Sequence, residues 1–154
     1  MPGRLVLAGL VTASLGALAL AFWVQYGLGY PPCSLCVQAR LPHYALVVGG
    51  GLALWFARPK LGLGLALVLL LAAFAISLRH VGVEAGWLPV PDGCVATTDG
   101  GDLDDLRSSL MAQTRPSCDQ PGPAVLGLTM AGWHAAAALA LALTAALALS
   151  ARRR

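Results

Sequence analysis

Residues 61–78 read LGLGLALVLLLAAFAISL, a stretch without a single charged side chain. A helix of this length nearly crosses the hydrocarbon core of a bilayer, which is ~30 Å thick and takes about 17–25 helical residues. The stretch lacks the alternation of apolar and polar residues that a barrel strand shows, so it predicts a membrane-spanning helix.

Three further apolar stretches flank this segment, at residues 5–25, 41–57 and 125–149. Only the short turn Arg-Pro-Lys separates the second span from the third, so these two helices should form an antiparallel hairpin. We therefore predict an all-α membrane protein, a four-transmembrane-helix bundle with two outer loops, folded as a single domain over residues 1–154.

The composition of the chain leads to the same conclusion. Of the 154 residues, 58% are hydrophobic and 11% are charged, whereas soluble domains carry about 25% charged residues. So few charges cannot cover the surface of a water-soluble globule of this size. A soluble enzyme, a disordered tail and a nucleic-acid-binding protein are excluded, and the lipid bilayer is the first partner that the sequence predicts.

The few charges are sorted between the two sides of the predicted bundle. All seven acidic residues fall in the segment 79–123, which forms one side together with the segment 26–40. Six basic residues and no acid fall on the other side, namely Arg4, Arg58, Lys60, Arg152, Arg153 and Arg154. Because loops rich in Lys and Arg stay cytoplasmic, we predict that both termini lie in the cytoplasm and that the two loops face outward, toward a bacterial periplasm or a similar space.

Two segments allow a second interpretation. Arg4 and the apolar run after it resemble a secretory signal peptide, but the run is long for one and leads into an aromatic border at Trp23 and Tyr26. We expect a retained span. In the second outer loop, the apolar residues of 103–111 recur near helical spacing, which predicts either a short helix on the membrane surface or a solvated loop.

All four cysteines lie on the predicted outer side. Cys33 and Cys36 form a Cys-x-x-Cys motif at the outer border of the second span, where unpaired helix N–H groups favour a thiolate. Cys94 and Cys118 lie far apart in the second loop. A periplasm permits disulfides, whereas the cytoplasm keeps thiols reduced.

The spacing of the cysteines leaves a redox system, structural disulfides or a zinc site open. Zinc is the least favoured, because Cys94 and Cys118 are far apart and no histidine stands at ligand spacing to them. Arg40 follows Cys36 by one helical turn, where a cation either holds a thiolate or a ligand carbonyl or only reaches the interface. His80, at the outer end of the third span, is either part of the same site or a satisfied hydrogen-bonding residue.

Several motifs together resemble the DsbB family, the disulfide bond formation proteins B of bacterial inner membranes. The resemblance covers nearly the whole chain, with four spans, two outer loops and one cysteine pair in each loop. The stretches that carry it are Pro31-Pro32-Cys33-Ser34-Leu35-Cys36 with Arg40, Arg79-His80-Val81, Cys94, Ser117-Cys118 and Leu126–Trp133.

The resemblance implies a protein-thiol:quinone oxidoreductase that reoxidises a DsbA-like periplasmic oxidase of the thioredoxin fold. Cys94 would form the mixed disulfide with that partner, and Cys118 would then attack Cys33. Cys36 would pass the electrons to a quinone of the membrane pool, either ubiquinone or menaquinone.

The same resemblance implies that Arg40 and His80 bind the quinone together with Cys36, and it implies no metal. Ala39 stands where the family usually has Gln or Glu. Residues 82–84 read Gly-Val-Glu where the family often has an aromatic residue and then Gln. Both departures fall in the expected quinone pocket, so the type of quinone stays open.

Two other functions are compatible with four spans and four cysteines. A vitamin K epoxide reductase-like enzyme also uses a four-helix bundle, but its Cys-x-x-Cys motif lies in a later span. A non-catalytic membrane scaffold would use the cysteines only to cross-link its outer loops.

Overall fold

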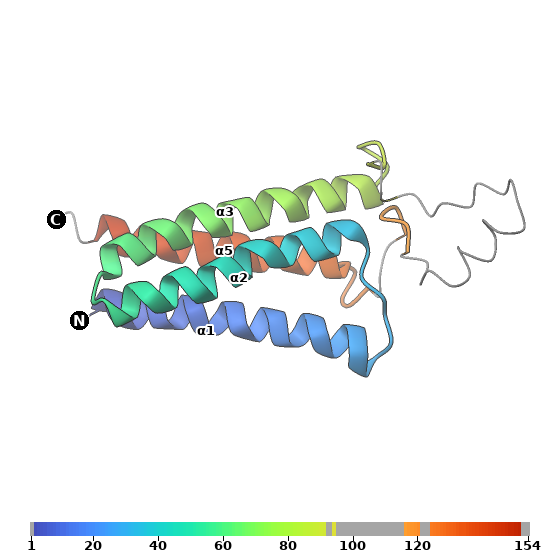
Figure 1. Ribbon diagram of the computed structural model, residues 1–154. Helices are drawn as coiled ribbons and strands as arrows, with labels where there is room; N and C mark the ends of the chain where they lie inside the picture. The colour runs from blue at the N-terminus through green and yellow to red at the C-terminus, as the bar shows by residue number, and fades with distance from the viewer. Residues whose placement is uncertain (1, 92–93, 95–115, 121–123, 152–154) are drawn as a thin grey trace, which may run out of the picture.

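A computed structural model describes residues 2–91, 94, 116–120 and 124–151. In this part of the chain, four long helices lie side by side in one bundle (Figure 1). They are α1 (Pro2–Phe22), α2 (Ser34–Trp55), α3 (Pro59–Glu84) and α5 (Met130–Ser150), and a π-helical segment, η1 (Trp23–Gly27), follows α1. The all-α prediction is confirmed for these residues, and the predicted surface helix at 103–111 lies outside them.

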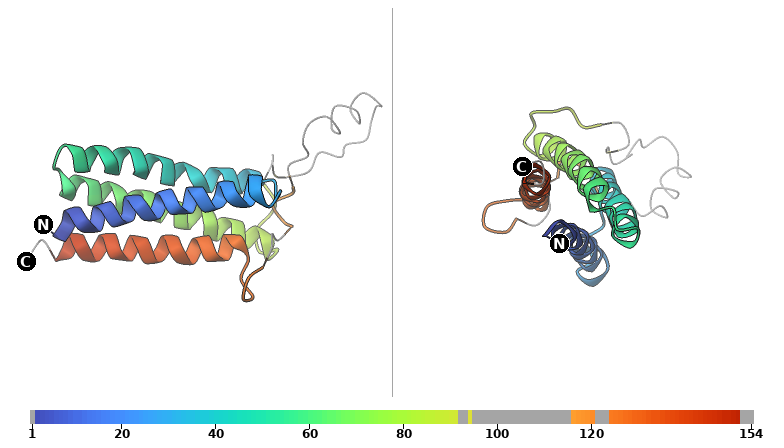
Figure 2. Two further views of the ribbon diagram at one scale, coloured as in Figure 1. Left: turned by 90° about the horizontal axis from the view of Figure 1, so that it is seen from below. Right: turned by 90° about the vertical axis from the view of Figure 1, so that its left-hand side faces the viewer.

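Three helices of the described part are long and apolar enough to cross a membrane: Gly3–Gly27, Pro59–Glu84 and Met130–Ser150. α2 is as long, at 22 residues, but polar side chains in its first half, Arg40 among them, reduce its mean hydropathy. Figure 2 shows that α1 begins and α5 ends at one end of the bundle, where the turn between α2 and α3 also lies. The cysteine-bearing segments meet at the opposite end.

Small side chains let the helices approach one another closely. α5 buries a row of alanines, namely Ala131, Ala135, Ala138, Ala142 and Ala145. Gly62 on α3 meets α1 and α2 at once, because a Cβ there would lie 2.8 Å from the Cβ of Ala53 and would also overlap Leu7. Close packing of this kind holds helices together in lipid, and it determines how the outer ends of α2 and α3 meet.

The helix that contains the predicted second span begins at Ser34, seven residues before the predicted start of the span at residue 41. Cys33 is its N-cap, and the sulfur accepts a hydrogen bond from the Cys36 N–H at 3.2 Å. Hydropathy marks the part of a helix that lies in lipid, whereas caps determine where the helix begins. The predicted loop 26–40 is therefore shorter, and the Cys-x-x-Cys motif belongs to the first turn of α2.

The third span also continues beyond its predicted end at residue 78. α3 ends at Glu84, so the predicted loop 79–123 begins later than expected. Polar residues do not end a helix when their side chains find partners, and here His80 and Glu84 contact each other one turn apart.

The last helix starts later than the apolar run that predicted it. α5 begins at Met130 and not at residue 125, because Thr129 caps it and accepts a hydrogen bond from the Gly132 N–H at 3.2 Å. Immediately before the cap, Leu126 and Gly127 turn the chain with φ of 52° and 80°. Apolar residues in this turn extended the predicted span.

Candidate active site

The Cys-x-x-Cys pair lies at the N-terminal end of α2. The sulfurs of Cys33 and Cys36 are 2.8 Å apart and both residues are free thiols. The capping position turns the Cys33 side chain toward the open N–H groups of the first helical turn, which brings it over Cys36. Cys33 is 5% exposed, so the inner pair, as we call Cys33 and Cys36, is largely shielded from solvent.

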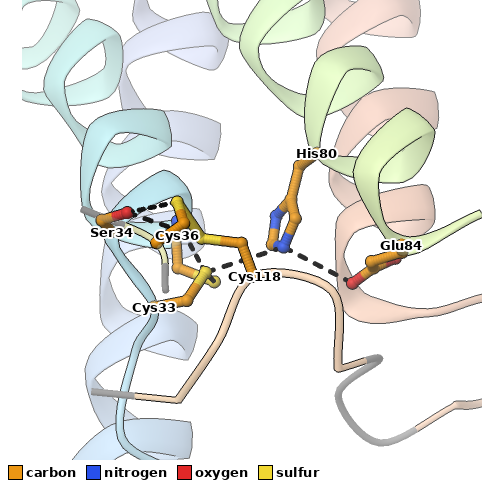
Figure 3. The surroundings of a disulfide bond; sticks show 7 residues. Cys33, Ser34, Cys36, His80, Glu84 and Cys118 are labelled. Atoms are coloured by element: carbon orange, nitrogen blue, oxygen red, sulfur yellow. Dashed lines mark hydrogen bonds and ion pairs between the residues drawn. A yellow bond between two sulfur atoms is a disulfide. The ribbon is translucent and has the colours of Figure 1, made fainter. Parts of the chain in front are cut away.

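His80 reaches the inner pair from α3 (Figure 3). Its Nε2 lies 3.6 Å from the sulfur of Cys33 and 3.5 Å from Oε1 of Glu84. The hydroxyl of Thr129, the cap of α5, donates a hydrogen bond to Oε2 of Glu84 at 2.7 Å. The Cys33 thiol of α2, the imidazole and carboxylate of α3 and the hydroxyl that caps α5 therefore follow one another.

The surroundings of Cys33 favour its ionised form. Its pKa lies well below the ordinary thiol value, because a hydrogen bond from the Cys36 thiol and a further one from His80 stabilise the thiolate against the opposing effect of burial. The Cys36 backbone N–H acts in the same direction. The thiolate is the form that attacks and leaves in disulfide exchange, so this site is prepared for such chemistry.

Cys94 and Cys118, the outer pair, form a disulfide with their Cα atoms 5.3 Å apart. Both sulfur-bearing residues are buried, and the Cys118 N–H donates to the Cys94 carbonyl at 3.2 Å. The hydroxyl of Ser34 lies 2.6 Å from the sulfur of Cys94 and 3.5 Å from that of Cys118. Ser34 stands between the two cysteines of the inner pair in sequence, so the outer disulfide rests directly on that motif.

One buried cluster holds both pairs. Cys33, Cys94 and Cys118 pack together with Leu35 and Val83, and Cys36 borders the cluster. The sequence predicted the two pairs on one side of the membrane but left their connectivity open. The fold brings them into contact, with the outer pair bonded and the inner pair reduced.

Arg40 lies apart from His80, although both were predicted beside one ligand. Its guanidinium donates to Oε1 of Gln25 at 2.7 Å and to the Ala21 carbonyl at 3.5 Å, and it lies 5.2 Å from the centre of the Phe22 ring. The cation is thus held against the end of α1, one turn below Cys36 on α2. The fold places His80 on the inner pair and Arg40 at the border between α1 and α2.

Sequence reasoning missed a polar network deeper in the bundle. His43 Nε2 lies 2.8 Å from His134 Nε2, and each ring has a serine on its other nitrogen: Ser14 at 3.2 Å and Ser77 at 2.5 Å, respectively. Because Ser77 donates its proton to the Ala73 carbonyl at 2.8 Å, it accepts from His134 Nδ1–H. His134 Nε2 then accepts from His43 Nε2–H. Each of the four helices contributes one member of this chain.

Ser34, Thr129 and the two bundle histidines were not singled out from the sequence. A serine between two cysteines does not by itself indicate a role. The role of Ser34 follows only from its contact with the outer disulfide. His43 and His134 did carry a usable signal, since an ionisable residue inside a membrane span needs a partner. Glu84 was noticed only as a departure, although its spacing of one turn from His80 predicts their contact.

Comparison with known proteins agrees with this arrangement. Residues 3–148 match the family model described as Disulfide bond formation protein DsbB. The chain is 29% identical over 129 residues to the uncharacterized protein RP370 of Rickettsia prowazekii, across 81% of this chain and 75% of that protein. It is 34% identical over 84 residues to Disulfide bond formation protein B of Haemophilus influenzae, across 52% of this chain and 48% of that protein. The match thus spans about half the length of the Haemophilus protein.

Proposed function

The chain belongs to the DsbB family of disulfide bond formation proteins, and on that premise we propose that it reoxidises a periplasmic DsbA-like dithiol oxidase and passes the electrons to a membrane quinone. The observation that carries the proposal is the contact between the two cysteine pairs through Ser34. Disulfide exchange requires a thiolate to reach a disulfide sulfur directly. Structural disulfides that only cross-link loops would not need to lie in one buried cluster.

The proposed sequence of exchanges starts at the outer disulfide. A thiolate of the reduced partner attacks Cys94, and Cys118 leaves as a thiolate. The partner's second thiolate then attacks the mixed disulfide, which releases the oxidised partner and leaves Cys94 as a thiolate. Two electrons have now moved from the partner to the outer pair.

The inner pair takes these electrons in the second exchange. Cys118 attacks Cys33 of the oxidised inner pair, and Cys36 leaves as a thiolate. Cys94 then attacks the resulting bond between Cys118 and Cys33, which restores the outer disulfide and releases Cys33. A bonded outer pair with free Cys33 and Cys36 is the arrangement that this last stage would leave.

A quinone, when bound, supplies a lipid-soluble acceptor for two electrons and two protons. Cys36, Arg40 and His80 are the residues proposed to hold it. Cys36 is the more exposed cysteine of the inner pair, and Arg40 presents a cation beside the Phe22 ring one turn away. A guanidinium donates well to carbonyl oxygens, and an aromatic face suits a flat ring. His80, in contact with Glu84, is placed to hold a proton near the Cys33 sulfur.

We further propose that the chain is a single domain of the bacterial inner membrane, with α2 as its fourth crossing and both termini in the cytoplasm. The helix ends support this topology, because the turn between α2 and α3 lies at the same end as the start of α1 (Figure 1). The basic residues Arg4, Arg58 and Lys60 all belong to that end of the bundle, as the positive-inside rule requires.

The test mixes the detergent-purified protein with a reduced DsbA-like partner and a water-soluble ubiquinone or menaquinone analogue, and follows loss of quinone absorbance. We expect continuous quinone reduction by the wild type and loss of it in Cys36→Ser. Thr144→Ala, which removes only a hydroxyl bonded within its own exposed helix face, serves as the matched control. Absence of quinone-dependent turnover, or unchanged turnover in Cys36→Ser, would favour a scaffold with cross-linked loops.

A further inference from the structure

Three atoms able to bind a metal converge where the inner pair meets α3. The sulfurs of Cys33 and Cys36 and the Nε2 of His80 all lie within 4.8 Å of one another. Figure 3 shows His80 directed from α3 toward the cysteines of α2. The family resemblance placed His80 beside Cys36 as a quinone-binding residue and implied no metal there.

The spacings resemble the edges of a zinc tetrahedron. Zn–S bonds of ~2.3 Å and Zn–N bonds of ~2.0 Å put sulfur and nitrogen about 3.6 Å apart, and Cys33 Sγ lies 3.6 Å from His80 Nε2. The nitrogen–oxygen edge is about 3.4 Å, and His80 Nε2 lies 3.5 Å from Oε1 of Glu84. Glu84 itself lies outside the group of three donors whose atoms are within 4.8 Å of one another. The sulfur–sulfur edge differs, at about 3.8 Å in zinc sites against 2.8 Å here. A change in the Cys36 side-chain torsion supplies that difference.

The charges of the site also suit a divalent cation. The Glu84 side chain beside His80 is 7% exposed and anchored by Thr129. Thiolate, imidazole and carboxylate are together the donors that Zn²⁺ takes in proteins.

We propose that the inner pair in its dithiol state binds one Zn²⁺ ion through Cys33, Cys36 and His80, the three donors that converge here, with Glu84 beside His80. Binding forms two Zn–S bonds, releases the protons that the two cysteines still hold, and changes no oxidation state. A Cys33–Cys36 disulfide removes both thiolates and therefore excludes the metal. Zn²⁺ and the electron acceptor thus compete for the same two sulfurs, and only this consequence for turnover rests on the proposed function.

The test measures Zn²⁺ affinity directly. The full chain carrying Cys94→Ser and Cys118→Ser is purified in detergent, reduced, and titrated with Zn²⁺ in competition with a chromophoric chelator. We expect one equivalent bound by the reduced protein and none after the inner pair is oxidised. His80→Ala in the same background should weaken binding about tenfold or more, whereas His134→Gln, which leaves all three donors in place, should not.

Co²⁺ supplies a second readout that does not depend on the His80 variant. The reduced protein should show the visible bands of tetrahedral Co²⁺ together with sulfur-to-metal charge transfer. Binding by the oxidised protein, an affinity unchanged in His80→Ala, or a Co²⁺ spectrum without tetrahedral bands would each overturn the proposal. Because no partner or quinone is present, these outcomes are independent of whether the relay itself turns over.

Discussion

At Cys33, three donors act on a single sulfur: the Cys36 thiol, the Cys36 N–H and His80. Because these contacts lower the pKa of Cys33, the thiolate persists as the pH falls below the ordinary thiol range, and it is lost only below the lowered pKa. In the Cys94→Ser, Cys118→Ser protein, alkylation of Cys33 should therefore still be rapid at about pH 6.

His80→Ala should shift that alkylation profile to higher pH. A hydrogen bond to a charged group contributes about 1.5–3 kcal/mol, which corresponds to a rise in the Cys33 pKa of about one unit or more. Rates of iodoacetamide labelling, mapped to Cys33 by mass spectrometry across pH, measure the shift. His134→Gln is the matched control, and an unchanged profile in His80→Ala would show that His80 does not act on Cys33.

Ser34 should assist reduction of the outer disulfide by the partner. Its hydroxyl lies 2.6 Å from the Cys94 sulfur and 3.5 Å from that of Cys118, where it can stabilise a sulfur that leaves as a thiolate. We expect Ser34→Ala to slow reduction of the outer disulfide by the DsbA-like partner about tenfold, since each 1.4 kcal/mol of transition-state stabilisation is tenfold in rate. Rapid-quench trapping of free thiols measures this step. Ser117→Ala should retain the wild-type rate, and equal rates in both variants would exclude this role for Ser34.

Among the helices, the chain from Ser14 through His43 and His134 to Ser77 connects all four elements at one level. Replacement of His134 by Leu breaks two of its links and leaves His43 and Ser77 each with one partner fewer. Interhelical hydrogen bonds in membranes contribute about 0.6–1.7 kcal/mol each, so His134→Leu should destabilise the bundle by about 1–3 kcal/mol. Detergent unfolding followed by circular dichroism tests this, with Thr144→Ala as the control. An unchanged free energy of unfolding in His134→Leu would mean that the network makes no net contribution to stability.

The existence of the helices was predictable, whereas their ends were not. Runs such as 61–78 identify a membrane helix from hydropathy alone, but Cys33 and Thr129 determine the starts of α2 and α5 through side-chain caps that hydropathy does not register. For the same reason the helical turn containing His80 and Glu84 was assigned to a loop. These helix ends are set by local polar contacts, and those contacts depend on which residues the fold brings together.

The candidate site was predictable in its residue types and not in its contacts. The Cys-x-x-Cys motif and Arg40 stand close in sequence, so their shared helix follows from spacing. The contact of His80 with Cys33 and that of Ser34 with Cys94 join segments far apart in the chain. Such contacts follow from the packing of α2 against α3, which small residues such as Gly62 permit, and no local pattern specifies them.

Across the whole molecule, charged residues are few and the polar groups occupy particular places. Only 11% of residues are charged, and the described cysteines with His80 and Glu84 gather at one end of the bundle (Figure 3). Under the proposed function, a soluble thiol protein would reach that end from water and a quinone would reach it from lipid. The bundle would then hold the outer pair and the inner pair at the boundary between the two phases.

The order of electron transfer is tested most directly by a single-turnover comparison of the wild type with Cys33→Ser. Each protein, in detergent with an excess of quinone, is mixed with a reduced DsbA-like partner, and partner disulfide and quinol are both quantified. We predict one quinol for each partner disulfide in the wild type. In Cys33→Ser, the partner should reduce the outer disulfide once and no quinol should form. Quinol formation by Cys33→Ser at the wild-type rate would contradict a relay through the inner pair.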